Sequence, residues 1–180
     1  IGTHVGAAQA HTTGRHTHLD FRCLTALFGH AGIEYDISAL DEEELARIAG
    51  WVGVHQRLRG LLHGGRTVRL DERDGAWLHG VVAPDRAHAV YAFVRLVTGA
   101  DALPGLVRLP GLDPELDYAV RAIDPTRRDD VPVRGEAMSQ PAWCSQEGVV
   151  LRGRALARYG LAMPVLNPAA GLLIEVTAQS

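Results

Sequence analysis

The spacing of apolar residues divides the chain into two parts. From residue 1 to residue 64, apolar side chains recur mainly at helical intervals, with one short extended run at the start. From residue 65 to residue 180, they occur in short runs or alternate with polar residues, which is typical of β-strands. The sequence therefore predicts a largely helical segment, 1–64, followed by a β segment, 65–180.

The clearest helix is predicted from Asp41 to His63. Asp41 followed by Glu44 fits a capping box, and acidic residues suit the positive end of a helix dipole. The apolar residues that follow form two rows: Leu45, Ile48, Ala49 and Val52; and Trp51, Val54, Leu58, Leu61 and Leu62. Two rows make a wider face than a lone surface helix needs. We expect this face to pack on elements that precede residue 1.

The segment before that helix has a mixed pattern. Ile1–Val5 predicts a buried strand, Gln9–Thr17 a polar loop, Leu19–His30 a helix and Ile33–Asp36 a short extended connection. The chain has no initiator Met and opens inside a predicted strand, as a fragment of a longer protein would.

The second part predicts an antiparallel β-sandwich, because six or seven short strands follow one another with turn residues between them. Thr126–Gln140 is polar and predicts a surface loop. The expected strands are Thr67–Leu70, Trp77–Ala83, Ala89–Leu96, Val107–Leu109, Tyr118–Ile123, Gly148–Leu151 and Leu172–Thr177.

Composition adds little beyond the class of protein. The 180 residues are 47% hydrophobic and 22% charged, as in an ordinary globular protein, and the formal net charge is -3. This charge gives no reason to expect a nucleic acid or an anionic membrane as partner. No apolar run approaches the roughly 20 residues that cross a bilayer. Two distant cysteines, Cys23 and Cys144, fit a reducing compartment, so we expect a cytoplasmic protein.

Four histidines near the start are the first candidates for chemistry: His4, His11, His16 and His18. Zinc can use three such ligands and a water. Their spacing matches no short metal motif, and histidines beside Thr and Gly more often form hydrogen bonds in loops. We therefore predict no metal site and no cofactor.

The remaining candidates favour structural roles. Asp20 is placed to start its helix and Asp36 to cap a turn. Cys23 lies within an apolar helical face and is predicted to be a packed thiol. Ser139 and Ser145 lack the G-x-S-x-G context of a serine hydrolase. The residues themselves predict no catalytic group.

Several segments, in order, match a family pattern. Ile1–Val5 resembles M-G-x-H-V, His11–Arg15 resembles N/H-x-x-G-R, and Phe21–Asp36 resembles R-x-x-x-A-x-F-G followed by G-x-E-x-D. The others are Leu58–Gly65, Gly80–Asp85, Leu109–Pro114 and Leu172–Val176. Together they resemble the C-terminal third of the bacterial α-galactosidases of glycoside hydrolase family 36.

The resemblance implies an α/β part followed by an all-β part. Residues 1–64 would be the last strand and helices of a (β/α)8 catalytic barrel, and residues 65–180 a C-terminal antiparallel β-sandwich domain. It also implies hydrolysis of terminal α-linked galactose from oligosaccharides, with retention, through two aspartates. Both family aspartates lie in motifs upstream of the M-G-x-H-V segment, so no catalytic residue is assigned here.

The resemblance makes His4, His11 and Arg15 candidates for support of the sugar pocket. A loop that leaves the final barrel strand would do so at the face where active sites of such barrels lie. The alternative is that these residues only hold the loop by hydrogen bonds. The uncovered apolar helix faces also predict self-association, hence a homo-oligomer.

Two other interpretations are open at this point. The β segment could be a free-standing carbohydrate-binding or interaction module, with Trp77, Tyr91 and Phe93 on one exposed sheet face. The histidine-rich loop could alternatively serve a small metal-dependent enzyme.

Overall fold

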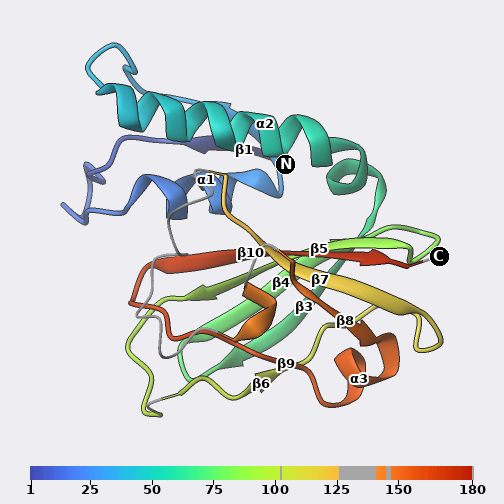
Figure 1. The fold of residues 1–180 in the computed structure, drawn as a ribbon. Helices are drawn as coiled ribbons and strands as arrows, with labels where there is room; N and C mark the ends of the chain where they lie inside the picture. The colour runs from blue at the N-terminus through green and yellow to red at the C-terminus, as the bar shows by residue number, and fades with distance from the viewer. Residues whose placement is uncertain (102, 126–140, 145–146, 180) are drawn as a thin grey trace.

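The computed structural model describes residues 1–101, 103–125, 141–144 and 147–179 (Figure 1). The predicted loop Thr126–Gln140 therefore lies outside the described residues. In chain order the elements are β1 (Gly2–Val5), α1 (Leu19–Leu27), β2 (His30–Ile33), α2 (Glu42–Gly64), β3 (Arg66–Arg73), β4 (Ala76–Val82), β5 (His88–Arg95), β6 (Leu106–Val107), β7 (Asp117–Ile123), the 3-10 turn η1 (Ala142–Cys144), β8 (Val149–Arg152), α3 (Gly153–Arg158), β9 (Leu161–Ala162) and β10 (Ala170–Ala178).

The first part of the chain forms a β-α-β unit. β1 and β2 pair in parallel, with Gly2 opposite His30 and Val5 opposite Ile33. Parallel strands need a crossover connection, which α1 and its flanking segments supply. The predicted helix Leu19–His30 is too long, because the chain leaves the helix at Leu27 and pairs with β1 instead. This pairing is a tertiary contact that no local pattern encodes.

Two further expectations for this unit are wrong. Ile1–Val5 is not a buried strand: Val5 is buried, while Gly2 and His4 are exposed and Thr3 is half-buried. It is also not the last parallel strand of the first part, because β2 follows it in the chain and pairs with it in parallel. All four residues of β2 are exposed, and β1 is its sole strand neighbour in the described structure.

Helix α2 begins as predicted and packs differently from the prediction. The Glu44 N–H donates to Oδ1 of Asp41 at 2.8 Å, which confirms Asp41 as the N-cap. Most of the second predicted row, together with Ile48 of the first, is buried within the chain itself, contrary to the expectation that the whole face packs on elements before residue 1. The buried residues are Ile48, Trp51, Val54, Leu58 and Leu62. In the first row, Leu45 and Val52 keep 40% and 42% exposure.

The second part is built on one antiparallel sheet, as predicted. Its six strands run in the order β3-β4-β5-β10-β7-β8, and every neighbouring pair is antiparallel. The second layer of the sandwich is much smaller, because it holds the short pair β6–β9 together with η1 and α3. Figure 1 shows α1 and α2 above the sheet and this smaller layer below it.

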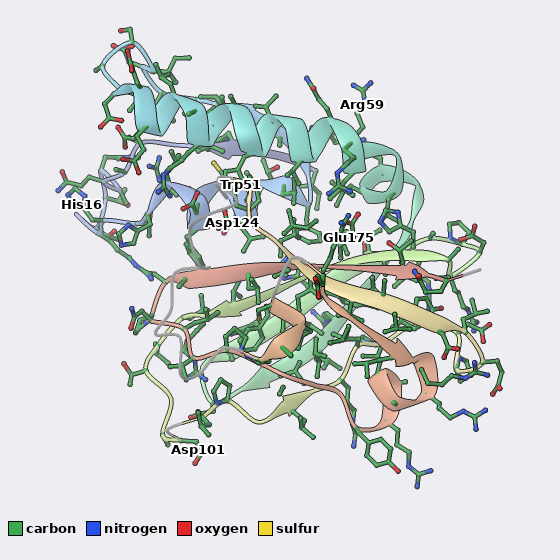
Figure 2. All side chains as sticks on the ribbon, in the orientation of Figure 1. His16, Trp51, Arg59, Asp101, Asp124 and Glu175 are labelled. Atoms are coloured by element: carbon green, nitrogen blue, oxygen red, sulfur yellow. The ribbon has the colours of Figure 1, made fainter. Side chains whose placement is uncertain are left out.

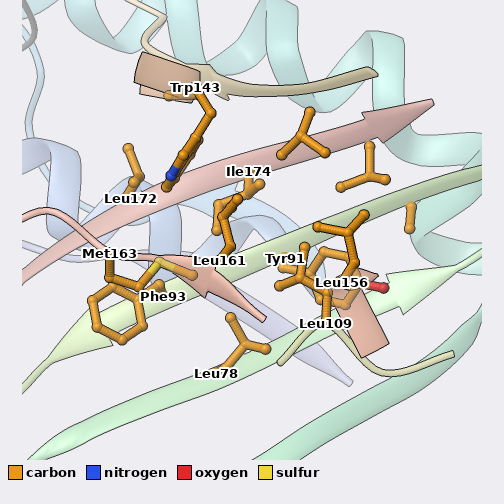
Figure 3. Close-up of a cluster of buried hydrophobic side chains, with 14 of the residues drawn as sticks. Leu78, Tyr91, Phe93, Leu109, Trp143, Leu156, Leu161, Met163, Leu172 and Ile174 are labelled. Atoms are coloured by element: carbon orange, nitrogen blue, oxygen red, sulfur yellow. The ribbon is translucent and has the colours of Figure 1, made fainter. Parts of the chain in front are cut away.

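Each face of the sheet carries its own core. On the lower face, Leu78, Tyr91, Phe93 and Ile174 pack against residues of the small layer, including Trp143 (Figure 3). On the upper face, the strands contribute Val81, Val90, Ala92 and Leu173 to a cluster with α1, α2 and β1. Strand β5 is buried on both sides, which explains its nearly continuous apolar run.

One charged side chain lies within the upper face. Glu175 on β10 is 2% exposed. Its Oε1 accepts from Arg57 Nη1 of α2 at 2.5 Å and lies 3.0 Å from His88 Nε2 of β5. Its Oε2 accepts from Arg121 of β7 at 2.7 Å. The side chain therefore links the helical layer to three strands of the sheet; it is labelled in Figure 2.

The environment of Glu175 decides its charge. Burial alone would raise its pKa, but hydrogen bonds from His88, Arg57 and Arg121 outweigh burial and lower the pKa from 4.5 to about 2. Both arginine side chains are about half exposed, at 46% and 53%, so their charges remain partly hydrated. The carboxylate thus stays ionised at neutral pH although it is almost fully buried.

We predict that Glu175→Gln lowers the free energy of unfolding by about 3 kcal/mol at pH 7. The folded pKa lies below the unfolded one, so this contribution is complete above about pH 4.5 and is lost as the pH falls towards 2. Urea unfolding at pH 7 and at pH 3 measures it. Glu147→Gln, at an exposed position, is the matched control. An equal difference between wild type and Glu175→Gln at both pH values would contradict the account.

Candidate functional site

The segments that leave the carboxyl ends of β1 and β2 form the candidate site. In sheets of parallel strands joined by helices, ligands bind beyond the carboxyl ends of the strands. Here those ends are Val5 and Ile33, and residues 6–18 and 34–41 follow them. The β-α-β topology therefore brings two connecting segments to the same edge.

His4 and Glu34 meet at this edge. His4 Nδ1 lies 3.0 Å from Glu34 Oε2, and both side chains are more than half exposed. The Glu34 N–H donates to the Val5 carbonyl, which extends the parallel ladder by one residue. Side chains alternate along a strand, and Val5 points into the cluster with α1. His4 therefore lies on the face of β1 opposite to Val5.

Residues 6–18 form a compact loop with its own hydrogen bonds. The Ala10 N–H donates to the Arg15 carbonyl at 2.9 Å, and the Thr17 N–H donates to the Ala8 carbonyl at 3.0 Å. A bridge joins Gln9 to His16, which is labelled in Figure 2 at the outer end of the fold. Gly14 has φ of 67°, a conformation that favours glycine at this turn.

The structure does not join His11 or Arg15 to His4. Both residues lie at the exposed turn of the loop. Within the described part of the chain, neither side chain has a hydrogen bond, ion pair or ring contact with His4. The three candidates therefore share one edge without forming a contact cluster.

Two further residues at this edge, Arg22 and Tyr35, were not indicated by the sequence. Arg22 Nη1 donates to the Gly6 carbonyl, and its Nε donates to the Thr17 carbonyl at 3.2 Å. Its guanidinium carbon lies 5.5 Å from the centroid of the Tyr35 ring. Arg22 opens the R-x-x-x-A-x-F-G segment, but no local pattern shows that it reaches both loops.

The two acidic candidates have structural partners. Asp20 accepts from Arg47 Nη1 at 2.6 Å and from Trp51 Nε1 at 3.0 Å, which ties α1 to α2. Asp36 accepts from the backbone N–H and hydroxyl of Ser38, which confirms the predicted turn cap. These hydrogen bonds lower the pKa of Asp36. Neither carboxylate faces the other.

Cys23 is a packed thiol, as predicted. It is 5% exposed, and burial raises its pKa to about 11, with a further increase from Asp20 and a small decrease from Arg22. A thiol with this pKa is a poor nucleophile at neutral pH. Cys144 is also buried.

The other interpretations find little support in the geometry. Tyr91 and Phe93 are buried at 0% and 2% exposure, whereas Trp77 is 44% exposed, so the proposed exposed aromatic sheet face is wrong. Across the described residues, no group of three or more His, Cys, Asp or Glu side chains is arranged to hold a metal ion. None of the described helices is long and apolar enough to cross a membrane.

Comparison with known families explains the arrangement. Residues 75–175, more than half of the chain, match the profile described as "Glycosyl hydrolase family 36 C-terminal domain". The chain belongs to glycosyl hydrolase family 36. Residues 1–65 match the profile described as "Melibiase". The family 36 resemblance of the sequence is thereby confirmed.

Proteins named as α-galactosidases resemble most of the chain. An α-galactosidase of Escherichia coli is 36% identical over 178 residues, which are 98% of this chain and 25% of that protein. The α-galactosidase AgaA of Geobacillus stearothermophilus is 31% identical over 142 residues, 77% of this chain and 19% of that protein. A solved structure of an AgaA variant in complex with raffinose matches with a TM-score of 0.79 at 26% identity, covering 99% of this chain and 22% of that one. The chain thus spans a quarter or less of these relatives.

Proposed function

We propose that the chain is the C-terminal part of a retaining α-galactosidase that removes terminal α-linked galactose from oligosaccharides. The observation that carries the proposal is the parallel β1–α1–β2 unit packed on an antiparallel sheet, in a chain whose first part matches the Melibiase profile and whose second part matches the family 36 C-terminal profile. The relatives are named as α-galactosidases, and each is about four or more times as long as this chain.

In this proposal, residues 1–64 are the end of a (β/α)8 barrel and residues 65–180 are the β-domain. A barrel strand pairs on both sides, whereas among the described residues β2 pairs with β1 alone, so its other edge could accept a further parallel strand. Beside that edge lies a mostly apolar groove of about 250 Å³, lined in part by Ala31, Ile33 and Val52. The barrel elements that precede residue 1 would cover this groove.

The catalytic carboxylates belong, in this proposal, to barrel strands upstream of residue 1. A retaining glycosidase needs two carboxyl groups about 5–5.5 Å apart, one as nucleophile and one as general acid. Asp20 and Asp36 are each engaged by structural partners on their own segments or on α2. We therefore assign no catalytic residue to the described part of this chain, and the reaction requires no cofactor.

The candidate site residues then surround the sugar without taking part in the bond cleavage. The face of β1 that carries His4 would become the inner face of the barrel. His11 and Arg15 would form part of the pocket wall at the carboxyl face. The oligosaccharide is the partner of the whole enzyme, which we place in the cytoplasm as a homo-oligomer. Exposed apolar residues outside the groove, such as Leu103 and Leu106, support association.

We predict that the chain restores activity to an α-galactosidase that lacks its own C-terminal quarter. The aligned 178 residues of the Escherichia coli relative are replaced by this chain, and release of nitrophenol from p-nitrophenyl α-galactoside is measured. The chimera should turn over, whereas the truncated relative and the isolated 180-residue chain should not. The released galactose should appear first as the α-anomer in proton NMR. Turnover by the isolated chain, or first release of the β-anomer, would refute the proposal.

A second prediction concerns the pocket wall. Arg15→Gln in the active chimera should raise KM about tenfold with little change in kcat, because a wall residue contributes binding in ground and transition states alike. Steady-state kinetics with raffinose and with the nitrophenyl substrate measures it. Arg69→Gln, at an exposed position of β3, should leave both parameters unchanged. Unchanged KM in Arg15→Gln would show that Arg15 only belongs to the loop.

A further inference from the structure

Arg22 contacts both segments that leave the carboxyl edge. It lies in α1, one turn after the start of the helix. Its two donor groups reach the Gly6 and Thr17 carbonyls, which stand at the two ends of the loop 6–18. Its guanidinium also lies over the ring of Tyr35, in the segment after β2. One side chain therefore joins three points on two segments.

The loop has no other described anchor to α1 along most of its length. The hydrogen bonds of residues 7–16, as far as the structure describes them, run within the loop or to its own end at Thr17. They join parts of the loop to one another and none reaches the helix, so in this exposed loop they open easily unless its two ends are held together. Apart from the backbone bond from the Arg22 N–H to the His18 carbonyl, the described hydrogen bonds between α1 and the loop are those that the Arg22 side chain makes at its two ends.

Arginine is suited to this task where lysine is not. The planar guanidinium holds several N–H donors at fixed directions, so it can serve two carbonyls that are 11 residues apart in sequence. The same plane can lie over an aromatic ring, which attracts its positive charge. A lysine ammonium would keep the charge but would not hold the two carbonyls and the ring at set distances.

We propose that Arg22 is a positioning residue of the α-galactosidase reaction, which holds the loop bearing His11 and Arg15 at the sugar pocket. This inference rests on the proposed function. A loop that is already ordered loses less conformational entropy when the sugar binds. Since the catalytic carboxylates lie elsewhere, Arg22 acts on substrate binding rather than on the chemical step.

The anchoring of the loop by Arg22 can be tested on the 180-residue chain, because this test does not require enzyme activity. Hydrogen exchange followed by NMR reports the amides of Ala10, Gly14 and Thr17, which donate within the loop. Arg22→Lys should speed their exchange about tenfold while the amides of β5 stay protected. Arg69→Lys, on an exposed position of β3, is the matched control and should change neither group. Unchanged exchange in Arg22→Lys overturns the proposal.

The effect of Arg22 on substrate binding is tested in the active chimera. Arg22→Lys should raise KM about tenfold and leave kcat within about twofold. A residue that serves folding alone would lower kcat through the fraction of active enzyme and leave KM unchanged, and that result overturns the positioning role. If the unsubstituted chimera has no activity, the proposed function fails and the role of Arg22 in catalysis fails with it. The exchange experiment would then still decide whether Arg22 anchors the loop.

Discussion

The central sheet is apolar on both faces, and this constraint fixes the rest of the structure. Val81, Val90 and Leu173 on the upper face have to be covered, and α1 and α2 cover them. The same face contains Glu175, a carboxylate that can be buried only where cations and hydrogen-bond donors surround it. Arg57 of α2 supplies one of them. The helical layer is thus bound to the sheet by apolar burial and by one buried charge.

This attachment explains how a β-domain can serve a site to which it contributes no described residue. With α1 and α2 fixed on the sheet, the strands β1 and β2 lie in a fixed position beside α1, and their carboxyl ends point to one edge. Arg22 of α1 then sets the direction of the segments that leave that edge. In the proposed enzyme, the β-domain would hold the last barrel helices in place, while the chemistry belongs to the strands upstream.

Much of the fold could be predicted from local patterns, and the failures share a physical cause. The cap at Asp41 and the strands β4, β5, β7 and β10 follow from capping residues and apolar periodicity. Strand β2 could not be predicted, because four residues are too few for a distinctive pattern and the segment becomes a strand through its pairing with β1. Glu175 lies within an apolar run, and its partners Arg57, His88 and Arg121 are 118, 87 and 54 residues away. The candidate site could likewise be predicted only in part. The family resemblance indicated His4, whereas the contacts of Arg22 with both connecting segments are visible only in the folded structure.

The claim that the helical layer and the sheet form one body is tested most directly by 5-fluorotryptophan labelling and fluorine NMR during urea unfolding. Trp51 on α2 reports the upper layer, and Trp143 in η1 reports the lower one; both are buried. The account predicts that the native signals of the two residues disappear with the same midpoint. A Trp51 signal that is lost at lower urea, while Trp143 remains native, would contradict it.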